Sequence, residues 1–197
     1  GNELWYKTFE EFLSHVHQTT DGGYIITGRK SFPNSSSRVY LIKTDGGGNE
    51  LWSNLFGGAD GDGGNSVQQT TDGGYIITGY TNSFGNGSSG PFVDGLFDVY
   101  LIKTDGSGNE LWYKTFGGTY FDIGYSVQQT TDGGYIIAGT SNLSGNGHLD
   151  VYLIKTDGNG NATSTFNIPI NSNRKLEKLV DILGRETKPQ TNTPFIE

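Results

Sequence analysis

Internal repetition is the property of this chain that narrows its possible folds most. The string Thr-Thr-Asp-Gly-Gly-Tyr-Ile-Ile occurs three times, with its aspartate at Asp21, Asp72 and Asp132. The string Val-Tyr-Leu-Ile-Lys-Thr-Asp-Gly also occurs three times, beginning at Val39, Val99 and Val151. Repeats of this length are typical of stacked arrays, in which neighbouring units bury each other's apolar faces.

Each repeat contains four short segments rich in Val, Ile, Leu, Tyr and Trp. Asp-Gly and Gly-rich stretches separate these segments, and such residues join hairpins because they tolerate positive φ. The segments carry apolar residues on both faces, as expected of strands whose sheet is covered on both sides. Each repeat is therefore predicted to form a four-stranded antiparallel meander.

An all-β chain of such meanders indicates a β-propeller-like repeat of four-stranded antiparallel blades, with a β-solenoid as the main competing architecture. We assign residues 10–58, 59–118 and 119–169 to three blades, residues 1–9 to the last strand of a preceding blade, and residues 170–197 to a separate tail. Closed propellers have roughly four to eight blades. Three blades and one extra N-terminal strand therefore predict either part of a larger propeller or self-association of the end blades.

Composition excludes several classes of partner. The net charge is −8, and most lysines outside the tail recur at fixed repeat positions, so we expect no nucleic-acid binding. The chain has no cysteine and hence no disulfide or thiolate metal site. No apolar run reaches the roughly 18 residues of a membrane span.

The repeats differ mainly in the loops between their second and third strands and in the links between units. Scaffold turns are held by backbone geometry while binding loops diverge, so we expect any ligand on the face that these variable loops form. Their aromatic and acidic residues are suited to stacking on sugars or chelating a hard cation. The candidates are Phe32, Asp60, Asp62, Phe84, Phe92, Asp94, Phe97, Tyr120, Phe121, Asp122, His148 and Asp150. The alternative is solvated loops without a ligand.

The segment Asp60-Gly-Asp62-Gly-Gly-Asn65 resembles a calcium loop, because alternating oxygen ligands on a Gly-rich backbone suit Ca²⁺. His15 and His17 would lie on one strand face, but they replace Ser and Gln of the other repeats and are interpreted as structural. No nucleophile elbow, zinc-protease motif or phosphate loop is present. The sequence therefore predicts no catalytic residue and no cofactor, with Ca²⁺ on this loop as the alternative.

The segment Asp105-Gly-Ser-Gly-Asn-Glu-Leu-Trp112, with its copy at 45–52, resembles the docking motif of quinoprotein-type propellers. The resemblance implies that an Asp, a Gly and a Trp of each copy tie adjacent blades together. The residues concerned are Trp5, Trp52, Trp112, Asp45, Asp105 and Asp157.

The whole repeat, over residues 1–169, resembles the repeats of secreted Bacteroidetes propeller proteins. Residues 173–194 resemble the C-terminal sorting region of type IX secretion cargo, in an incomplete form. These resemblances imply a secreted or cell-surface protein that is exported by the type IX secretion machinery. We expect a non-catalytic binding module for an extracellular glycan or protein, with a polysaccharide hydrolase or lyase using loop carboxylates as the alternative.

Overall fold

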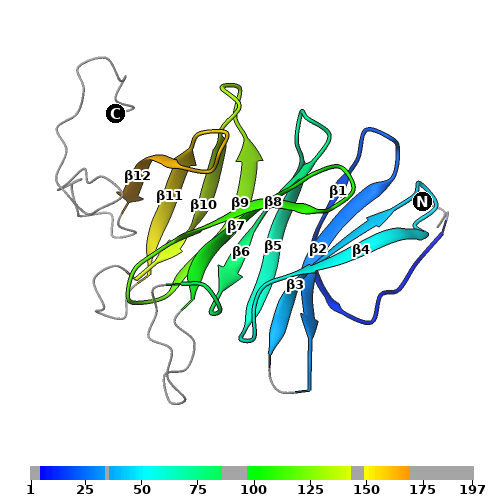
Figure 1. Ribbon diagram of the computed structural model, residues 1–197, viewed down its shortest axis with the longest axis horizontal. Helices are drawn as coiled ribbons and strands as arrows, with labels where there is room; N and C mark the ends of the chain where they lie inside the picture. The colour runs from blue at the N-terminus through cyan, green and yellow to red at the C-terminus, as the bar shows by residue number, and fades with distance from the viewer. Residues whose placement is uncertain (1–4, 34–35, 86–96, 143–148, 169–197) are drawn as a thin grey trace.

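The structure is a computed structural model that describes residues 5–33, 36–85, 97–142 and 149–168. Within these ranges the chain forms twelve strands and no helix, so no helical segment there could cross a membrane. The predicted tail at 170–197 lies outside the described residues. Figure 1 shows the strands gathered into three sheets that stack face to face.

Each sheet is a meander of four consecutive strands. Sheet 1 contains β1 (Phe12–Gln18), β2 (Tyr24–Ser31), β3 (Ser37–Thr44) and β4 (Glu50–Phe56). Sheet 2 contains β5 (Asp62–Gln69), β6 (Tyr75–Thr81), β7 (Asp98–Thr104) and β8 (Glu110–Phe116). Sheet 3 contains β9 (Asp122–Gln129), β10 (Tyr135–Ser141), β11 (Asp150–Thr156) and β12 (Ala162–Ile168). All pairings are antiparallel, which confirms the prediction of three four-stranded units; no sheet is closed on itself.

Two apolar cores hold the stack together, one at each junction between sheets. The first joins one face of sheet 1 to sheet 2 and contains Ile25, Val39, Leu41, Val67, Tyr75, Ile77, Tyr100 and Ile102. The second joins the other face of sheet 2 to sheet 3 through the same repeat positions, and contains Ile76, Val99, Leu101, Val127, Tyr135, Ile137, Tyr152 and Ile154. Sheet 2 is thus covered on both faces, which explains why its strands lack clean polar alternation.

On the two outer sheets, some repeat positions that are buried in sheet 2 are exposed. Val67 and Val127 are 0% and 3% exposed, whereas their counterpart Val16 on β1 is 56% exposed. On sheet 3, Val151 is 37% exposed, whereas Val99 is fully buried in sheet 2. One face of sheet 1 and the opposite face of sheet 3 therefore lack the neighbour that covers the matching face of sheet 2.

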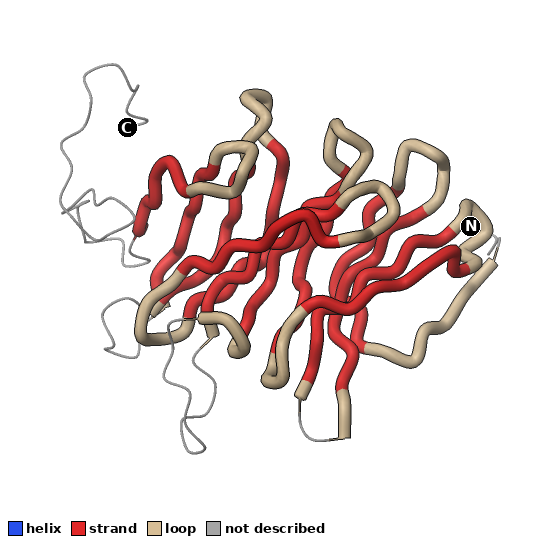
Figure 2. The backbone as a smooth tube through the Cα atoms, viewed as in Figure 1, coloured by secondary structure: helices blue, strands red, loops and turns tan. Residues whose placement is uncertain are grey.

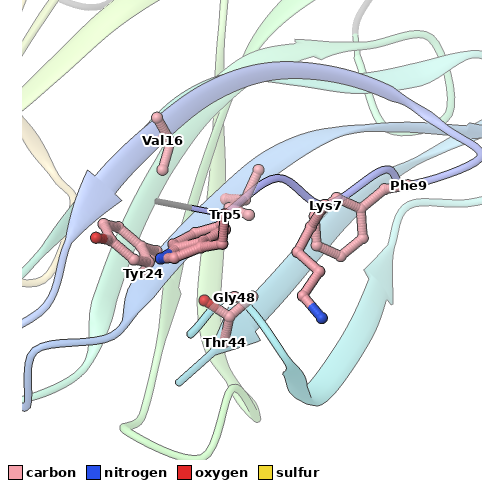
Figure 3. Close-up of a pocket in the computed structure, with 8 residues that line it drawn as sticks. Trp5, Lys7, Phe9, Val16, Tyr24, Thr44 and Gly48 are labelled. Carbon is pink, nitrogen blue, oxygen red and sulfur yellow. The ribbon is translucent and has the colours of Figure 1, made fainter. Parts of the chain in front are cut away.

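Residues 5–9 run along this uncovered face of sheet 1 without forming a strand, so the expected N-terminal strand is not found there. The reason is that no described strand lies beside them to complete a hydrogen-bond ladder. Trp5 nevertheless packs edge-on against Tyr24 at 6.0 Å. With Phe9, Val16 and Gly48 these two residues line a mainly apolar pocket of about 300 Å³ (Figure 3).

Tryptophans of one sheet dock on a glycine turn of the next. Trp52 on β4 packs against Tyr75 of sheet 2 with ring centroids 5.9 Å apart, and Trp112 packs against Tyr135 at 6.0 Å. A Cβ atom on Gly108, in the β7–β8 turn, would stand 2.5 Å from the Trp52 ring. Gly108 also has a φ of +80°, so glycine is required there for two reasons.

The resemblance to the propeller docking motif implied that the turn aspartates tie adjacent sheets together. In the structure their hydrogen bonds stay within their own turn. Asp45 Oδ1 accepts the backbone amides of Gly47 and Asn49, and Asp45 Oδ2 accepts the Asn49 side-chain amide. The same bonds recur at Asp105 and Asp157. An Asp two and four residues before these amides closes the turn locally. The bridge from sheet 1 to the β7–β8 turn is made by Trp52 on Gly108 and by Asn54, which donates to the Gly108 carbonyl at 2.9 Å.

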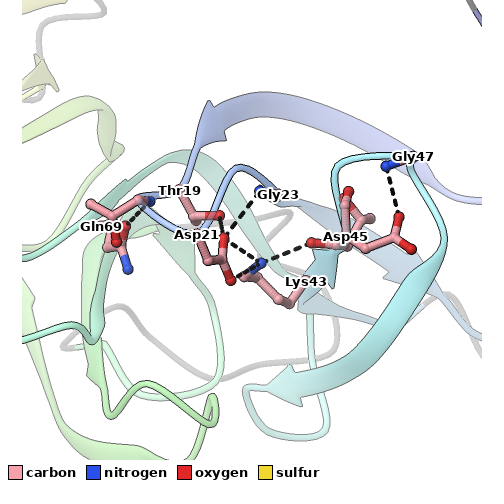
Figure 4. Close-up of polar contacts among 9 residues, drawn as sticks. Thr19, Asp21, Gly23, Lys43, Asp45, Gly47 and Gln69 are labelled. Carbon is pink, nitrogen blue, oxygen red and sulfur yellow. Dashed lines mark hydrogen bonds and ion pairs between the residues drawn. The ribbon is translucent and has the colours of Figure 1, made fainter.

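A lysine braces the first turn of each sheet, buried in sheets 1 and 2 and partly buried in sheet 3 (Figure 4). The Nζ of Lys43 reaches from β3 to Asp21 at 2.9 Å and donates to the Thr44 carbonyl at 2.8 Å. Lys103 with Asp72 and Lys155 with Asp132 repeat the arrangement. The ammonium group of each of these lysines is therefore bound within its own sheet. Gln69 then links the turns of successive sheets by accepting the Thr20 amide at 2.8 Å.

Candidate functional site

The two ends of the stack differ in the way the sequence suggests. The β1–β2, β5–β6 and β9–β10 turns lie at one end, at the top of Figure 2, and the β4–β5 and β8–β9 links lie at the other. The loops after β2, β6 and β10 must also reach that second end, because each sheet is an antiparallel meander. We call this second end the variable end.

Three aromatic rings form a row across the variable end. Tyr80 is the penultimate residue of β6, Phe97 precedes β7 and Phe121 precedes β9. The Tyr80 and Phe97 rings meet edge-on at 4.7 Å, and Phe97 lies 5.9 Å from Phe121. Phe121 is 37% exposed and its neighbour Tyr120 is 41% exposed. This aromatic row spans sheets 2 and 3 and reaches solvent at Phe121.

A groove of about 310 Å³ adjoins the aromatic row at Tyr80. It lies between β1–β2 and β5–β6, and its lining includes Phe12, Arg29, Asn65 and Tyr80. Arg29 donates from Nη1 to the Tyr80 hydroxyl at 3.2 Å, and its guanidinium stands 4.9 Å from the centre of the Phe12 ring. Gly63 permits this arrangement, because a Cβ atom there would stand 2.6 Å from the Tyr80 ring. The groove therefore combines aromatic faces with charged and amide donors.

Other predicted aromatic residues sit near the variable end without joining the row. Phe84 is 39% exposed and stacks on Tyr113 at 5.0 Å, so it belongs to a second aromatic group with Tyr100. Phe32 follows β2, and the Arg38 guanidinium lies 5.8 Å from its ring. Phe92, Asp94 and His148 lie outside the described residues.

The predicted calcium loop at 60–65 does not bring its carboxylates together. Asp62 is fully buried and accepts hydrogen bonds from the Thr81 and Ser83 hydroxyls and from the Gly58 amide. Asp60 is exposed, and Asn65 donates to the Gly124 carbonyl in the next sheet. Asp62 thus closes the link between sheets 1 and 2 instead of facing a ligand. The side chains that would supply the oxygen ligands therefore have different surroundings, with Asp62 buried in the link, Asp60 in solvent and Asn65 bound to the next sheet.

Asp122 occupies the same position in sheet 3 and is also buried, at 1% exposure. Its Oδ2 accepts the Gly118 amide at 2.9 Å, as Asp62 accepts Gly58. Burial raises the pKa of the Asp122 carboxyl above its ordinary value. Neither Asp62 nor Asp122 is exposed to a glycan bound at the variable end. Asp150 lies partly buried at the start of β11.

The histidines of β1 do not form a metal site with the other described residues, among which no group of three or more His, Asp and Glu side chains gathers. His15 accepts the Val67 amide through Nδ1 at 3.3 Å and so helps to bind sheet 2 to sheet 1.

Sequence reasoning missed Arg29 and Tyr80 as members of the candidate site. Both were expected at the first positions of the variable loops but lie within β2 and β6, and only the packing of sheet 1 on sheet 2 brings them together. Their position at the strand ends nearest the variable loops was the one available signal. No protein-family model matches the chain, and no curated protein matches it.

Proposed function

We propose that the chain is a non-catalytic binding scaffold whose sheets are successive blades of a propeller, with a glycan site at the variable end. The aromatic row and the adjoining groove carry this proposal. Sugar rings bind to exposed aromatic faces by stacking, and flanking Arg and Asn donors orient their hydroxyls. The described residues provide these groups together at Arg29, Tyr80 and Phe121.

The propeller arrangement is supported by the two repeated junctions. Each junction buries the same repeat positions, and the first strand of each sheet lies against the preceding sheet. The uncovered faces at Val16 and Val151 fit further blades of the same design. A regular rotation from sheet to sheet would bring the first strands around a common axis.

We further propose that the protein acts outside the cell, as a secreted or cell-surface module exported through the type IX machinery. The resemblance of residues 173–194 to a sorting region supports this location. Fractionation of the native host with an antibody to the chain tests it, and recovery of the protein from the cytoplasm alone would overturn it.

Binding to a glycan array, followed by calorimetry with the strongest ligand, tests the glycan site. Phe121→Ala and Tyr80→Ala should each weaken binding about 5- to 150-fold, since an aromatic ring stacked on a planar ligand contributes about 1–3 kcal/mol. Tyr6→Ala is the matched control, because Tyr6 is 76% exposed and lines neither the groove nor the row. Equal affinity of Phe121→Ala and Tyr6→Ala for the glycan would exclude the row as the site.

The same glycan also tests the proposal that the chain is non-catalytic. Incubation with the chain should release no new reducing ends or unsaturated products. Turnover that disappears in Asp60→Asn, at the exposed carboxylate of the β4–β5 link, would establish the hydrolase or lyase alternative instead.

A further inference from the structure

Residues 5–9 lie on sheet 1 in the way that the fourth strand of one sheet lies on the next sheet. The Trp5 ring is 6.0 Å from the first tyrosine of β2, at 61°, and the Trp112 ring of β8 is 6.0 Å from the first tyrosine of β10, at 59°. A Cβ atom on Gly48 would stand 2.6 Å from the Trp5 ring (Figure 3), and one on Gly160 would stand 2.6 Å from the Trp112 ring. The docking contact is therefore formed, although no described strand pairs with residues 5–9.

The sequence of this segment is that of β8. Residues 1–9 and 108–116 are both Gly-Asn-Glu-Leu-Trp-Tyr-Lys-Thr-Phe. In sheet 2, β8 pairs with β7, whose sequence Asp-Val-Tyr-Leu-Ile-Lys-Thr is also the sequence of β11 in sheet 3. The present partner of β11 is β12, which shares no residue with β8 and has Ser164 at the register position of Trp112. Sheet 3 thus contains the strand that residues 5–9 match, but lacks the docking tryptophan.

The uncovered faces of sheets 1 and 3 supply the two apolar halves of one junction. In both formed junctions, a valine and a leucine of the third strand share a core with a valine and an isoleucine from the first two strands of the next sheet. Sheet 3 has Val151 and Leu153 at the first pair of positions, and sheet 1 has Val16 and Ile26 at the second pair. One copy of the chain can therefore cover the exposed Val16 of another.

The polar groups of the two faces are complementary as well. At the junction between sheets 2 and 3, the Gln129 amide donates to Gln68 Oε1 at 2.7 Å, and the Thr71 amide donates to Gln129 Oε1 at 2.9 Å. The counterpart of Gln68 on sheet 3 is Gln128, and the counterpart of Gln129 on sheet 1 is Gln18. Both are exposed. Packing of sheet 3 on sheet 1 of a second copy would repeat these bonds.

We propose that copies of this chain associate head to tail by strand exchange, with residues 5–9 of one copy replacing β12 beside β11 of the next. One ladder replaces another, so few hydrogen bonds are lost, while the apolar faces at Val16 and Val151 become buried. Because β12 must first leave β11, the dilute chain stays monomeric and the exchanged form grows with concentration.

Two copies carry six sheets, within the range of about four to eight at which propellers close. A closed dimer is therefore expected. Closure of the ring rests on the blade arrangement proposed above, whereas the exchange itself rests only on the repeated junctions and is independent of the glycan site.

Sedimentation velocity of the full chain from about 1 to about 200 µM tests the association, and we expect a monomer at the lower and a dimer at the higher concentration. The double variant Lys7→Pro/Thr8→Pro should weaken dimerisation about tenfold or more. Neighbouring amides of a strand point to opposite sides, so one of the two prolines removes a ladder donor. Lys7→Ala/Thr8→Ala keeps both amides and is the matched control, which should still dimerise.

Cysteine cross-linking tests the strand register. In sheet 2 Leu101 lies opposite Lys114, so exchange would place Leu153 opposite Lys7 of the next copy. The chain has no cysteine of its own, and Lys7→Cys/Leu153→Cys should form disulfide-linked dimers under mild oxidation. Tyr6→Cys/Leu153→Cys is the control, because successive side chains of a strand point to opposite faces and this pair should stay reduced.

A chain that stays monomeric at about 200 µM would overturn the proposal. So would a dimer that survives the two prolines, or one in which Lys7→Cys/Leu153→Cys does not cross-link, because the faces would then associate without exchange. Cross-linked species longer than a dimer would support the exchange and contradict the blade arrangement, since the sheets would then stack without closing. Glycan binding by a monomeric chain would leave the glycan site intact while this inference fails.

Discussion

Replacement of Gly108, in the β7–β8 turn, by alanine should destabilise the protein. The left-handed backbone at φ +80° costs an L-residue about 1–2 kcal/mol. The new methyl would also stand 2.5 Å from the Trp52 ring, and overpacking of this kind costs about 1–3 kcal/mol more. We therefore expect a loss of about 3 kcal/mol, which corresponds to a melting temperature lower by about 6–12 °C for a chain of this size.

Urea unfolding monitored by tryptophan fluorescence measures this loss. Gly73→Ala is the matched control, since Gly73 has a φ of +83° but no atom within 4 Å of the new Cβ position. It should lose only about 1 kcal/mol, because alanine also restricts the unfolded chain. In a Trp52→Leu background the difference between the two alanine substitutions should narrow, and the remainder would reflect Asn54 Nδ2, which lies 2.6 Å from the new Cβ position on Gly108. Equal losses in the wild-type background would refute the docking of Trp52 on this turn.

Three further predictions concern buried positions and acid stability. Burial by itself would raise the pKa of the Asp72 carboxyl, but hydrogen bonds from Thr70 and Lys103 outweigh it and lower the pKa to about 2. This carboxylate therefore stabilises the fold above about pH 4, and its contribution is lost as the pH falls to 2. Asp72→Asn should therefore have a lower urea midpoint than wild type at pH 6, by an amount equivalent to about 1 kcal/mol, and the same midpoint at pH 2. Val67→Ser should cost about 2–3 kcal/mol in urea unfolding, whereas Val16→Ser, at the uncovered counterpart, should change stability by less than about 0.5 kcal/mol. Thr81→Val should cost about 1–3 kcal/mol in the same assay, because it leaves the buried Asp62 carboxylate short of a donor, and a neutral result would show that the bond contributes little.

The repeat made the strand order predictable from the sequence. A turn such as Thr19-Thr-Asp-Gly-Gly is a local structure, closed by the Asp21 side chain and a left-handed Gly22, and it recurs because its residues recur. Hairpin pairing follows directly from such turns, which is why three four-stranded meanders could be predicted. Trp52 and Trp112 were identified through the same repetition.

Sequence reasoning was less informative where the role of a segment or side chain depended on a neighbour from another strand. Residues 5–9 have the sequence of a strand but lack a partner beside them, and a strand is defined by its ladder. Asp62 has the spacing of a calcium ligand, yet Thr81 at the end of β6 and Ser83 in the loop that follows already donate to it.

The sequence alone determined the repeating unit, its four strands and the turns between them, because these depend on residues close together in the chain. Only the tertiary structure decided which faces are covered and which aromatic rings line up. Tyr80 and Phe121 come from different strands and are brought together by the packing of one sheet on the next. Packing of this kind depends on the shapes of whole faces, and no local pattern of residues encodes it.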